Sequence, residues 1–546
     1  MPTHQVNLDA LIRREDFESA DTEDGVNSKP LFKIEELAPN RMYFSVLRKP
    51  AFQRPTNNWT SEMIVSLVES YLDGALVPAL ILWHSRVSGK IFIIDGAHRL
   101  SALVAWVNDD YGNGSLSRKF YEGDISPAQV RLDQATRELM NARVGSYESV
   151  YRAGLNPIPE DPTEKIRRGR AIATVQPPIQ EVTGDAETAE RSFVKINENP
   201  AKIDPTDLDV LRARAKPNTI AARALMRFGT PYFDKMARAN EIKTLSDEVY
   251  RIIFGQIVDM GTQSPDIPKA GIPYSSDAFE MVLDMINIFN GITDSMWKES
   301  RAKKPKANSE VRLPDDVDGS LTIQYLNRVK EVGALVSDNG KHDSGSLGFD
   351  PAVYAYGATG KFHPAAFLAS MRFAEELREK KKLIAFTSVR RDFEEFLVTH
   401  KDFINQLVHT KGGGTRPLDA VLTMFQIVFE CFVSGNRNEE EIVSRLRQEE
   451  KLKALNDVSN LPTETITKRR RFSKTVQLAA VLRSILENRE RCKECDARLP
   501  PSCRSQDHNV RQIDGGTGSL FNHAFTHPFC NSGYKEYKTS RARTSE

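Results

Sequence analysis

The sequence lacks the features that carry a chain into or across a membrane. It holds no apolar run of 18 or more residues, the length that a membrane-spanning helix needs. Its first 20 residues are polar, carry charges of both signs and have neither an apolar core nor a small-residue cleavage site, so we expect no secretory signal. We therefore expect a cytoplasmic protein without a membrane partner.

Cysteine is scarce, and its distribution is uneven. Only five cysteines occur in 546 residues, and four of them, Cys492, Cys495, Cys503 and Cys530, lie within the last 55 residues. Because thiols stay reduced in the cytoplasm, a cluster of this kind indicates metal binding rather than disulfide bonds.

An excess of one charge sign is also missing from the chain as a whole, which has 75 Lys+Arg and 74 Asp+Glu for a net charge of +1. The C-terminal end differs from the rest. Residues 468–546 contain 16 basic and 8 acidic side chains, a net of +8, so the remaining residues carry −7. A basic end on a slightly acidic body indicates a polyanionic partner for that end.

The length and composition indicate an α+β protein of several domains. A chain of 546 residues with 40% hydrophobic and 27% charged residues is too long for a single core and suggests two to four domains. Composition and periodicity divide it into a polar leader, a mixed α/β domain, a mostly helical middle domain and a terminal module, which span residues 1–30, 31–204, 205–464 and 465–546.

The apolar periodicity of the α/β domain predicts alternating helices and strands. Residues 61–71 place four large apolar side chains on one helical face. Short apolar runs at 79–83 and 91–94 predict buried strands on either side of a Ser-Gly turn, and a helix is expected at 100–107. The polar stretch 120–190, with its proline-containing segments, is expected to contain loops.

The middle domain shows helical periodicity but no motif that assigns a chemistry. An apolar stripe at 279–286 follows a Ser-Asp cap, and residues 418–432 are strongly apolar, as is typical of buried helices. We interpret the aromatic-rich stretch 346–364 as packed core rather than as the lining of a pocket. We expect the middle domain to couple the two ends of the chain.

The terminal module contains two pairs of metal-ligating residues with the same spacing. Two residues separate Cys492 from Cys495, and two separate His527 from Cys530. Two such turns together supply four ligands in a tetrahedron, which suits structural zinc, and a small module with few large apolar groups needs such a staple. Cys503 fits the spacing less well and is interpreted as a core thiol. The alternative is a set of unrelated buried thiols.

Between the two pairs lies the segment Asp507-His508-Asn-Val-Arg-Gln-Ile-Asp-Gly-Gly, followed by Asn522 and by Asn531 directly after Cys530. An Asp-His pair, a Gly-Gly turn, an internal Asn and a final Cys-x-x-Cys-Asn occur together in HNH endonucleases with Asn at the third motif position. Residues 492–546 resemble this family, with His527 in place of one cysteine. The resemblance implies a zinc-stapled ββα-metal HNH domain that hydrolyses phosphodiesters.

The residue types of the motif suit this chemistry. Hydrolysis of a phosphodiester needs a base for the attacking water and a cation for the negative charge that develops. His508 is the candidate base, because neutral imidazole is available near pH 7. Asp507 and Asn531 offer hard oxygen ligands for one catalytic Mg²⁺ or Mn²⁺. The resemblance implies that Asn522 braces the loop and orients His508. A zinc ribbon that only binds DNA is the alternative for the whole module.

Three further side chains are candidates for contacts with double-stranded DNA. His523 follows Asn522 directly, and Lys535 and Lys538 follow the motif. Cations at these positions suit phosphate contacts that do not depend on base sequence. The alternatives are a surface histidine and a solvated basic tail.

A second informative segment, Asp95-Gly96-Ala97-His98-Arg99, follows the strand predicted at 91–94 and opens the next helix. Gln53-Arg54-Pro55 and Trp59 lie upstream, and Phe193-Val-Lys-Ile-Asn197 lies downstream. Together these elements resemble the ParB/sulfiredoxin-like domain at the N-terminus of GmrSD-type modification-dependent restriction enzymes, over residues 40–200. The family usually has two glutamines at the positions of Ala97 and His98.

The same segment suits a nucleotide phosphate. A glycine between strand and helix presents backbone N–H groups at a helix N-terminus, and Arg99 adds a bidentate donor. Relatives in the family bind and in several cases hydrolyse nucleoside triphosphates. The resemblance therefore implies a site for ATP or GTP, built from Gln53, Arg54, Asp95, Gly96, His98 and Arg99. The alternative is a structural Asp95–Arg99 ion pair in a domain that hydrolyses nothing.

The two resemblances together imply a defence enzyme. They describe a restriction-type, antiphage DNA endonuclease whose HNH domain is gated by an N-terminal domain that senses an NTP or modified DNA. Two alternatives stay open at this point: a phage nicking or homing endonuclease without nucleotide control, and a ParB-like DNA-binding protein whose zinc module only recognises DNA. A monomer and a homo-oligomer are equally compatible with the sequence.

Overall fold

The computed structural model describes most of the chain, which forms two compact units. The N-terminal unit comprises Met1–Asn240, Pro268–Ser276 and Asp294–Ser320, and the C-terminal unit comprises Glu241–Ile267, Asp277–Thr293 and Leu321–Glu546. Each unit thus takes part of the middle of the chain. The described residues are 5–15, 33–50, 53, 56–57, 59–86, 88–121, 123, 125–174, 176–197, 209–210, 212–226, 236–258, 276–302, 312–337, 344–412, 414–455 and 474–545.

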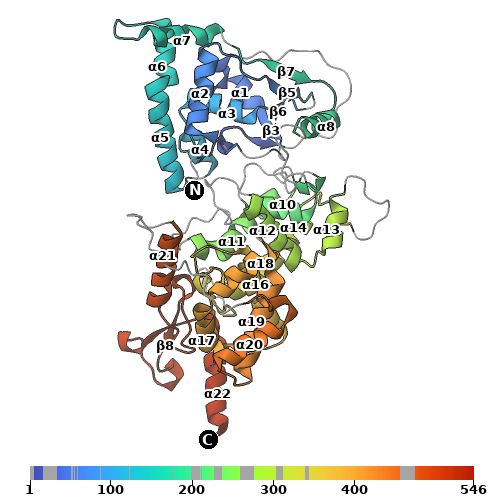
Figure 1. The fold of residues 1–546 in the computed structure, drawn as a ribbon, viewed down its shortest axis with the longest axis vertical. Coiled ribbons are helices and arrows are strands. Elements are labelled where there is room, and N and C mark those ends of the chain that lie inside the picture. Colours follow the sequence, from blue (N-terminus) through green and yellow to red (C-terminus); the bar gives the residue numbers. More distant parts are fainter. Residues whose placement is uncertain are drawn as a thin grey trace. The chain divides into compact units, whose positions relative to one another are not determined.

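A five-stranded mixed sheet forms the centre of the N-terminal unit (Figure 1). Its strand order is β2-β3-β6-β5-β7, with β6 parallel to β3 and antiparallel to β5. A separate antiparallel pair joins β1 to β4. The strands are β1 (Gln5–Val6), β2 (Arg14–Glu15), β3 (Leu47–Pro50), β4 (Trp59–Thr60), β5 (Leu80–His84), β6 (Ile91–Asp95) and β7 (Ile179–Val182).

Helices surround this sheet, and those predicted next to the motif are confirmed. The helix predicted at 61–71 is α2, and the helix predicted at 100–107 is α3, which begins three residues earlier. The helices of the N-terminal unit are α1 (Met42–Val46), α2 (Ser61–Leu72), α3 (Ala97–Asn108), α4 (Ser115–Phe120), α5 (Pro127–Arg143), α6 (Tyr147–Leu155), α7 (Thr163–Thr174), α8 (Ala186–Asn197), α10 (Pro217–Leu225) and α13 (Asp294–Ser300).

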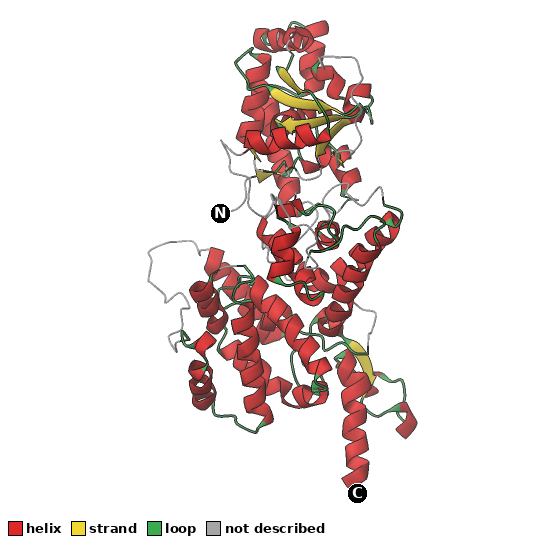
Figure 2. Cartoon of the chain, turned by 90° about the vertical axis from the view of Figure 1, so that its right-hand side faces the viewer, coloured by secondary structure: helices red, strands yellow, loops and turns green. Residues whose placement is uncertain are grey.

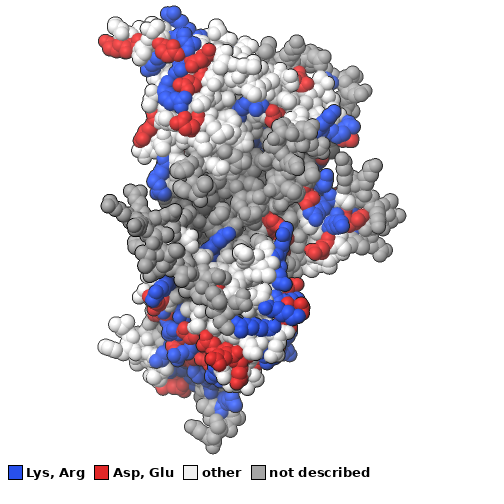
Figure 3. All heavy atoms as spheres, in the orientation of Figure 1, with Lys and Arg blue, Asp and Glu red and all other residues white. Residues whose placement is uncertain are grey.

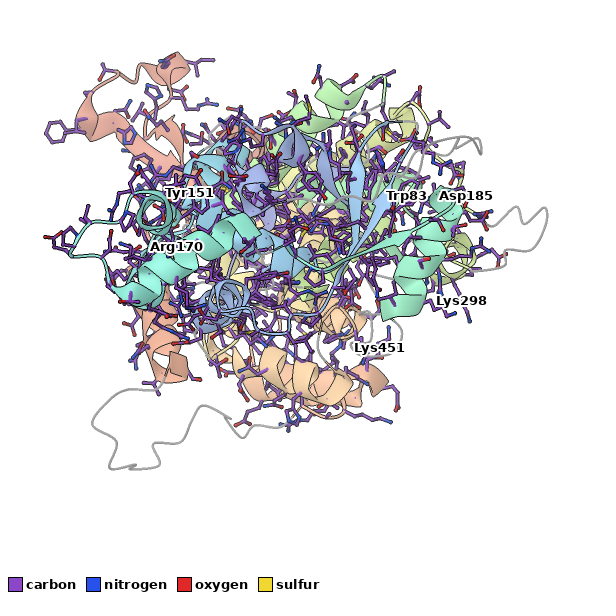
Figure 4. All side chains as sticks on the ribbon, turned by 90° about the horizontal axis from the view of Figure 1, so that it is seen from above. Trp83, Tyr151, Arg170, Asp185, Lys298 and Lys451 are labelled. Carbon is purple, nitrogen blue, oxygen red and sulfur yellow. The ribbon has the colours of Figure 1, made fainter. Side chains whose placement is uncertain are left out.

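Both faces of the sheet are buried, and the alternation of side chains along its strands explains how. Leu82 and Ile93 lie in one core with residues of α2 and α3. Trp83 and Phe92, their neighbours in the chain, lie in a second core with residues of α8. The indole Nε1 of Trp83, labelled in Figure 4, also donates a hydrogen bond to the carbonyl of Gly184 at 2.9 Å. Helices on both faces therefore hold β6 and its C-terminal Asp95 in place.

Helices α5, α6 and α7 occupy most of the stretch in which the sequence predicts loops. Figure 4 labels Tyr151 on α6 and Arg170 on α7, and these two helices pack against each other. Apolar periodicity does not reveal α5, because its buried face is largely polar. Gln129 Nε2 donates to the carbonyl of Tyr111 at 2.9 Å, and Asp133 accepts from the N–H of Tyr111 at 3.0 Å.

The exposed surface around these helices carries paired charges. Arg143 contacts Glu62 at 2.7 Å, and Arg137 contacts Asp109 at 3.0 Å. Figure 3 shows basic and acidic atoms intermixed over this part of the N-terminal unit. Exposed pairs of this kind contribute little to stability, and on the face shown they leave no field of one sign that would attract a polyanion.

Residues 5–15 belong to the folded unit, although the sequence places them in a polar leader of residues 1–30. Val6, Leu8 and Leu11 are buried in the main core, and β2 pairs with β3. The polar side chains between them do not prevent burial, because Asp9 and Arg14 pair with each other at 2.8 Å. The other residues of the predicted leader lie outside the described residues.

The C-terminal unit is mostly helical. Its centre is a cluster of aromatic rings in which Phe373, Phe386, Phe393 and Phe425 have centroids 5.4 to 6.0 Å apart in neighbouring pairs. Its helices are α11 (Ala239–Val258), α12 (Ser276–Phe289), α14 (Ser320–Val336), α15 (Pro351–Tyr354), α16 (Pro364–Glu379), α17 (Leu383–Thr399), α18 (Asp402–Lys411), α19 (Leu418–Val433), α20 (Glu439–Gln448), α21 (Lys474–Asn488) and α22 (Lys535–Ser545).

Two predictions about this unit are confirmed. The apolar stripe at 279–286 lies on α12, and the run at 418–432 forms α19. The aromatic-rich stretch 346–364 is packed core, because Phe349, Tyr354, Tyr356 and Phe362 are all buried. No helix among the described residues combines the length and the apolar character that crossing a membrane requires.

The terminal module, which we define as residues 474–545, is attached to the helical part of the C-terminal unit by specific bonds. Phe529 donates its backbone N–H to the carbonyl of Ser346 at 2.9 Å. Arg489 contacts the buried carboxylate of Asp350 at 2.6 Å. Figure 2 shows that, among the described residues, strands occur in the N-terminal unit and in this module, while helices make up the rest. The module is therefore part of one folded unit with the helices.

Candidate functional site

A short hairpin and the turn that follows it form the framework of the C-terminal candidate site. Strand β8 (Ser505–His508) pairs antiparallel with β9 (His523–Thr526), in a register that places His508 opposite His523. The chain then passes through a π-helical turn, Cys530–Tyr534, into α22. Asp507 and His508 lie on β8, Asn522 directly precedes β9, and Asn531 lies in the π-helical turn.

The four predicted zinc ligands come together. The ligand atoms of Cys492, Cys495, His527 and Cys530 all lie within 4.8 Å of one another. His527 Nδ1 is 3.4 Å from Cys495 Sγ and 3.8 Å from Cys530 Sγ. Two ligands come from the turn before β8 and two from the turn after β9, so the pairs meet as the spacing predicts. Cys503 is buried nearby but is not one of the four.

The imidazole of His527 is oriented for metal binding. Its Nε2 lies 3.0 Å from the carbonyl of Arg498, and only a protonated Nε2 can donate to that oxygen. Nδ1 then carries the lone pair, and it faces the cysteine sulfurs. A ligating histidine is commonly fixed in this way through its second nitrogen.

The three cysteine sulfurs lie so close together that a cation between them would stabilise their ionised forms. Hydrogen bonds with Cys492 and Cys495 and the burial of the site raise the pKa of the Cys530 thiol well above its usual value. Three crowded thiols cannot all ionise without a positive charge between them, and a metal ion supplies that charge. The donor set of three sulfurs and one nitrogen, nearly all buried, fits structural zinc.

Asp507 lies at the centre of the candidate catalytic site. Its carboxylate oxygens are 2.8 and 2.9 Å from Lys535 Nζ, which also donates to the carbonyl of His508 at 2.6 Å. The side chains of Asp507 and Lys535 are only 9% and 11% exposed. Burial of this degree strengthens the attraction between the two charges relative to a surface pair. Lys535, a predicted DNA contact, thus forms an ion pair with Asp507, the predicted metal ligand.

Asn531 approaches the same strand from the π-helical turn. Its Nδ2 donates to Ser505 Oγ at 2.8 Å and to the carbonyl of Gln506 at 3.3 Å. Both bonds use the amide nitrogen, so the amide oxygen stays available as a hard ligand beside Asp507. The structure therefore holds Asn531 against β8, the strand that carries Asp507.

Asn522 braces the loop between β8 and β9. Its Oδ1 accepts from the N–H of Val510 at 2.6 Å, and its Nδ2 donates to the carbonyls of Val510 and Thr517 at 3.0 and 2.7 Å. Gly516 is required where the loop closes, because a Cβ there would overlap the carbonyl of Val510. The loop joins His508 to Asn522, so this bonding holds the strand end that carries His508.

His508 and His523 are half-buried at the end of the hairpin, opposite each other. Gln512 Nε2 lies 3.5 Å from His508 Nε2. His523 packs edge-on against Phe525, with ring centroids 4.6 Å apart. Lys538 lies one turn after Lys535 on α22 and contacts Glu494 at 3.0 Å. His508 and His523 thus occupy facing positions at the end of the hairpin.

The N-terminal candidate site lies where β6 ends and α3 begins. Gly96 has a φ of 91°, and a Cβ there would lie 2.6 Å from Leu80 Cδ2, so both the conformation and the space demand glycine. Arg99 Nη2 is 2.8 Å from Asp95 Oδ2 and donates to the carbonyl of Ala79 at 3.0 Å. The guanidinium of Arg99, the predicted phosphate donor, is therefore bonded to Asp95 at the end of β6 and to the residue before β5.

Of the other residues predicted for this site, the structure describes His98 and Gln53. His98 stacks on Trp59, with ring centroids 5.8 Å apart and planes inclined by 22°. The carbonyl of Gln53 accepts a hydrogen bond from Arg14. Arg54 lies outside the described residues.

A buried charge cluster beside Gln53 has no counterpart in the sequence analysis. Asp9 Oδ1 accepts from Lys49 Nζ at 2.7 Å, from Arg14 Nη2 at 2.8 Å and from the N–H of Thr56 at 3.1 Å. Burial alone would raise the pKa of Asp9, but the charges of Arg14 and Lys49 lower it. The residues are far apart in the chain and form no motif. The mixture of apolar and charged residues in the segment 5–15 is the only sequence signal of internal partners.

One comparison with known proteins bears on the N-terminal unit. Residues 34–214 match the family described as GmrSD restriction endonuclease, N-terminal domain. No curated protein and no solved structure matches the chain. The match covers the strands β3, β5, β6 and β7 of the sheet, α3 and the helices that flank them, so this part of the chain is similar to a GmrSD-type N-terminal domain.

Proposed function

We propose that this protein is a restriction-type DNA endonuclease, in which the terminal module hydrolyses phosphodiester bonds and the GmrSD-type domain controls the cut. The match of residues 34–214 to a domain of restriction endonucleases supports the restriction role. The observation that carries the nuclease is the arrangement of Asp507 and His508 on β8 with Asn531, which bonds to the same strand from the turn that begins at Cys530 of the Cys₃His cluster.

His508 takes the part of the general base. It ends β8 at a half-buried position, where an imidazole keeps contact with solvent water. A neutral imidazole can accept the proton of an attacking water near pH 7. The loop bonds of Asn522 hold the strand end on which His508 stands, so Asn522 acts as a positioning residue.

Asp507 and Asn531 would hold the catalytic Mg²⁺ or Mn²⁺. Oxygen donors of this type are those that the two ions prefer. A bound divalent cation would stabilise the negative charge that develops on the scissile phosphate. The ammonium of Lys535 occupies the carboxylate of Asp507 at 2.8 Å, so Lys535 has to turn away when the carboxylate binds the metal. Its charge is then free for a DNA phosphate.

The Cys₃His cluster would hold structural zinc rather than take part in the reaction. All four ligand positions come from the protein, and a closed tetrahedral site leaves no position for water. Zinc at this place ties the turn before β8 to the turn after β9. The catalytic hairpin between them then keeps its register.

We further propose that the GmrSD-type domain binds a nucleoside triphosphate or modified DNA and thereby licenses the nuclease. A nuclease that is toxic to its host needs a state in which it does not cut, and a ligand can supply that control only by binding the two states differently. Gly96, His98 and Arg99 are the residues of this domain that the proposal places near the ligand. The chain would then serve in defence against invading, including viral, DNA.

A nuclease without nucleotide control is the second candidate. The contacts of Arg99 with Asp95 and with the carbonyl of Ala79 favour it, because they engage the guanidinium that would otherwise bind a phosphate. In this case the GmrSD-type domain would hold DNA and respond to no NTP.

A plasmid cleavage assay tests the proposal. Modified and unmodified supercoiled DNA are incubated with the full chain and Mg²⁺ or Mn²⁺, with and without ATP or GTP, and EDTA serves as the metal-free control. We expect metal-dependent nicking or linearisation that His508→Ala abolishes. Cleavage that is equal with and without every NTP on both DNAs selects the second candidate. No cleavage by wild type under any of these conditions overturns the nuclease.

A further inference from the structure

The loop between β8 and β9 carries large apolar side chains that are exposed to solvent. Among the described residues, no other part of the terminal module covers them. Phe521 is 95% exposed, Leu520 84%, Ile513 79% and Val510 52%. Isolated exposed apolar residues are common on protein surfaces and need no explanation. These four side chains belong to the single loop between β8 and β9, and apolar side chains gathered on one surface element mark binding surfaces.

The loop that carries these side chains is held in shape by its own backbone. Asn509 Nδ2 donates to the carbonyls of Phe521 and His523 at 3.3 and 3.2 Å, and its N–H donates to the carbonyl of Asn522 at 2.7 Å. Gly516 donates to the carbonyl of Arg511 at 3.0 Å. The apolar side chains are therefore presented by a braced loop, and their exposure does not result from an unbonded one.

The charges of the loop are compensated within the module. Arg511 contacts Asp514 at 2.7 Å and Glu536 at 3.4 Å. The outer part of the loop is thus apolar or neutral, whereas residues 468–546 as a whole carry +8. In DNA recognition, phosphate contacts come largely from cationic side chains, whereas apolar side chains can contact only the bases and sugars. The loop has the composition of a base-contacting element in a basic module.

The place of the loop in the hairpin decides which partner it meets. It begins directly after His508 and ends at Asn522. A DNA phosphate at which His508 acts as general base would therefore lie close to the apolar side chains of this loop. We propose that Leu520 and Phe521 enter the stack of DNA bases next to the scissile phosphate and unstack one base step. This inference rests on the proposed nuclease function and adds how its substrate is held.

Apolar wedges of this kind are a known way to kink duplex DNA, because the contacts they gain offset the loss of base stacking. An aromatic ring on a base contributes about 1–3 kcal/mol, and Phe521 is the only aromatic side chain of the loop 509–522. A second copy of the chain is the competing occupant. Four side chains offer less apolar area than the roughly 800 Å² that each partner of a stable interface buries, so we commit to DNA.

The test uses the full chain with zinc and separates binding from cutting. Leu520→Ala/Phe521→Ala is introduced into the wild type and into the His508→Ala background, which binds without cutting. Leu76→Ala is the matched control, because Leu76 is fully exposed in the N-terminal unit. Affinity is measured by fluorescence anisotropy on a duplex that the wild type cuts, with 2-aminopurine placed beside the mapped cut to report unstacking.

We expect the double variant to bind the matched duplex about tenfold more weakly or worse, the lower part of the range for stacking on one base, and to lose the rise in 2-aminopurine fluorescence. A duplex with a two-nucleotide bulge at the cut is already unstacked, so it should restore binding and cleavage to the variant. Leu76→Ala should behave as the wild type on both duplexes.

Three outcomes overturn the inference. In the first, the double variant and Leu76→Ala bind the matched duplex with equal affinity although the wild type cuts it. This result rejects the wedge but leaves the proposed nuclease function intact. Another is an equal loss on the matched and the bulged duplex. The third is a dimer of the wild type that becomes a monomer in the double variant, as measured by light scattering. If the wild type neither binds nor cuts DNA, the nuclease function itself fails, and the inference fails with it.

Discussion

The two candidate sites each contain an Asp and a basic side chain in contact, but these pairs arise in different ways. Asp95 ends β6 and Arg99 lies in the first turn of α3, so the short turn at Gly96 brings the two side chains together. Asp507 and Lys535 are 28 residues apart. They meet only because the hairpin, the π-helical turn and α22 are folded against one another.

This difference affects what each pair can be taken to mean. The local turn between β6 and α3 accounts for the pair of Asp95 and Arg99, so their contact alone does not argue for a ligand. The pair of Asp507 and Lys535 is held by the tertiary fold, is almost buried, and lies beside Asn531. The C-terminal site therefore rests on long-range structure, and the N-terminal site rests on a family match. Four predictions test this contrast.

The largest effect is expected at the metal centre. Cys492→Ser or Cys530→Ser should lose zinc and unfold the terminal module, because zinc binding contributes about 10–16 kcal/mol to folding in small domains. Elemental analysis and limited proteolysis measure the two losses, and DNA cleavage should disappear with them. Cys503→Ser is the near control and Cys431→Ser on α19 the distant one, since neither belongs to the four ligands. Unchanged metal content in Cys492→Ser contradicts the centre.

The second effect is on the reaction itself. His508→Ala should reduce cleavage by about 10²-fold or more, the contribution of a general base, without loss of zinc or of thermal stability. Quantitative nicking kinetics on supercoiled plasmid measure the reduction. His409→Ala, an exposed histidine at the end of α18, should cut as the wild type does. A His508→Ala variant that cuts at the wild-type rate removes His508 from the mechanism.

The third prediction concerns the N-terminal pair. If Arg99 binds a nucleotide phosphate, Arg99→Ala should weaken ATP or GTP binding by about 1.5–3 kcal/mol, the value of a hydrogen bond to a charged group, and should change DNA cleavage. Asp95→Ala should act in the same direction. Calorimetry with each nucleotide, run beside the cleavage assay, measures both effects.

The control for this prediction is a pair with the same spacing. Arg137 and Asp133 on α5 are also four residues apart and 2.7 Å from each other. If Arg99→Ala and Arg137→Ala both lower the melting temperature and neither changes nucleotide binding, the pair of Asp95 and Arg99 is structural.

The smallest effect is expected from Lys535. Lys535→Met removes the cation that competes for Asp507, so the affinity for Mn²⁺ in the absence of DNA should rise about tenfold, the equivalent of about 1.4 kcal/mol. Titration calorimetry with zinc already bound measures it. Lys538→Met, one turn further along α22, should leave Mn²⁺ affinity unchanged. A lower affinity in Lys535→Met would show that Lys535 supports the metal site instead of competing with it.

The sequence predicts those parts whose signal is local. The strands β5 and β6 and the helices α2 and α3 follow from apolar periodicity, and the meeting of the four zinc ligands follows from two equal spacings. Helix α5 does not follow, because Gln129 and Asp133 face inwards and are satisfied by the backbone of Tyr111. The Ser126–Pro127 cap at its start is the signal that could have revealed it.

The contacts of the candidate sites are less predictable than their residue types. The motif identifies Asp507 but not the ammonium on it, because that contact depends on how α22 leaves the turn at Cys530. Likewise, a charge at Asp9 in an apolar segment does not reveal that Lys49, forty residues away, neutralises it. Spacing along the chain predicts ligand pairs, whereas tertiary packing decides their counter-charges.

The attachment of the metal centre to the helices limits how this protein can be taken apart. Phe529 bonds to Ser346, and Arg390 of α17 donates to the carbonyl of Gly348, which lies against His527. A transplant of the last segment alone into another protein would leave these bonds behind and expose one wall of the centre. The smallest part that can be exchanged between proteins is therefore the whole C-terminal unit.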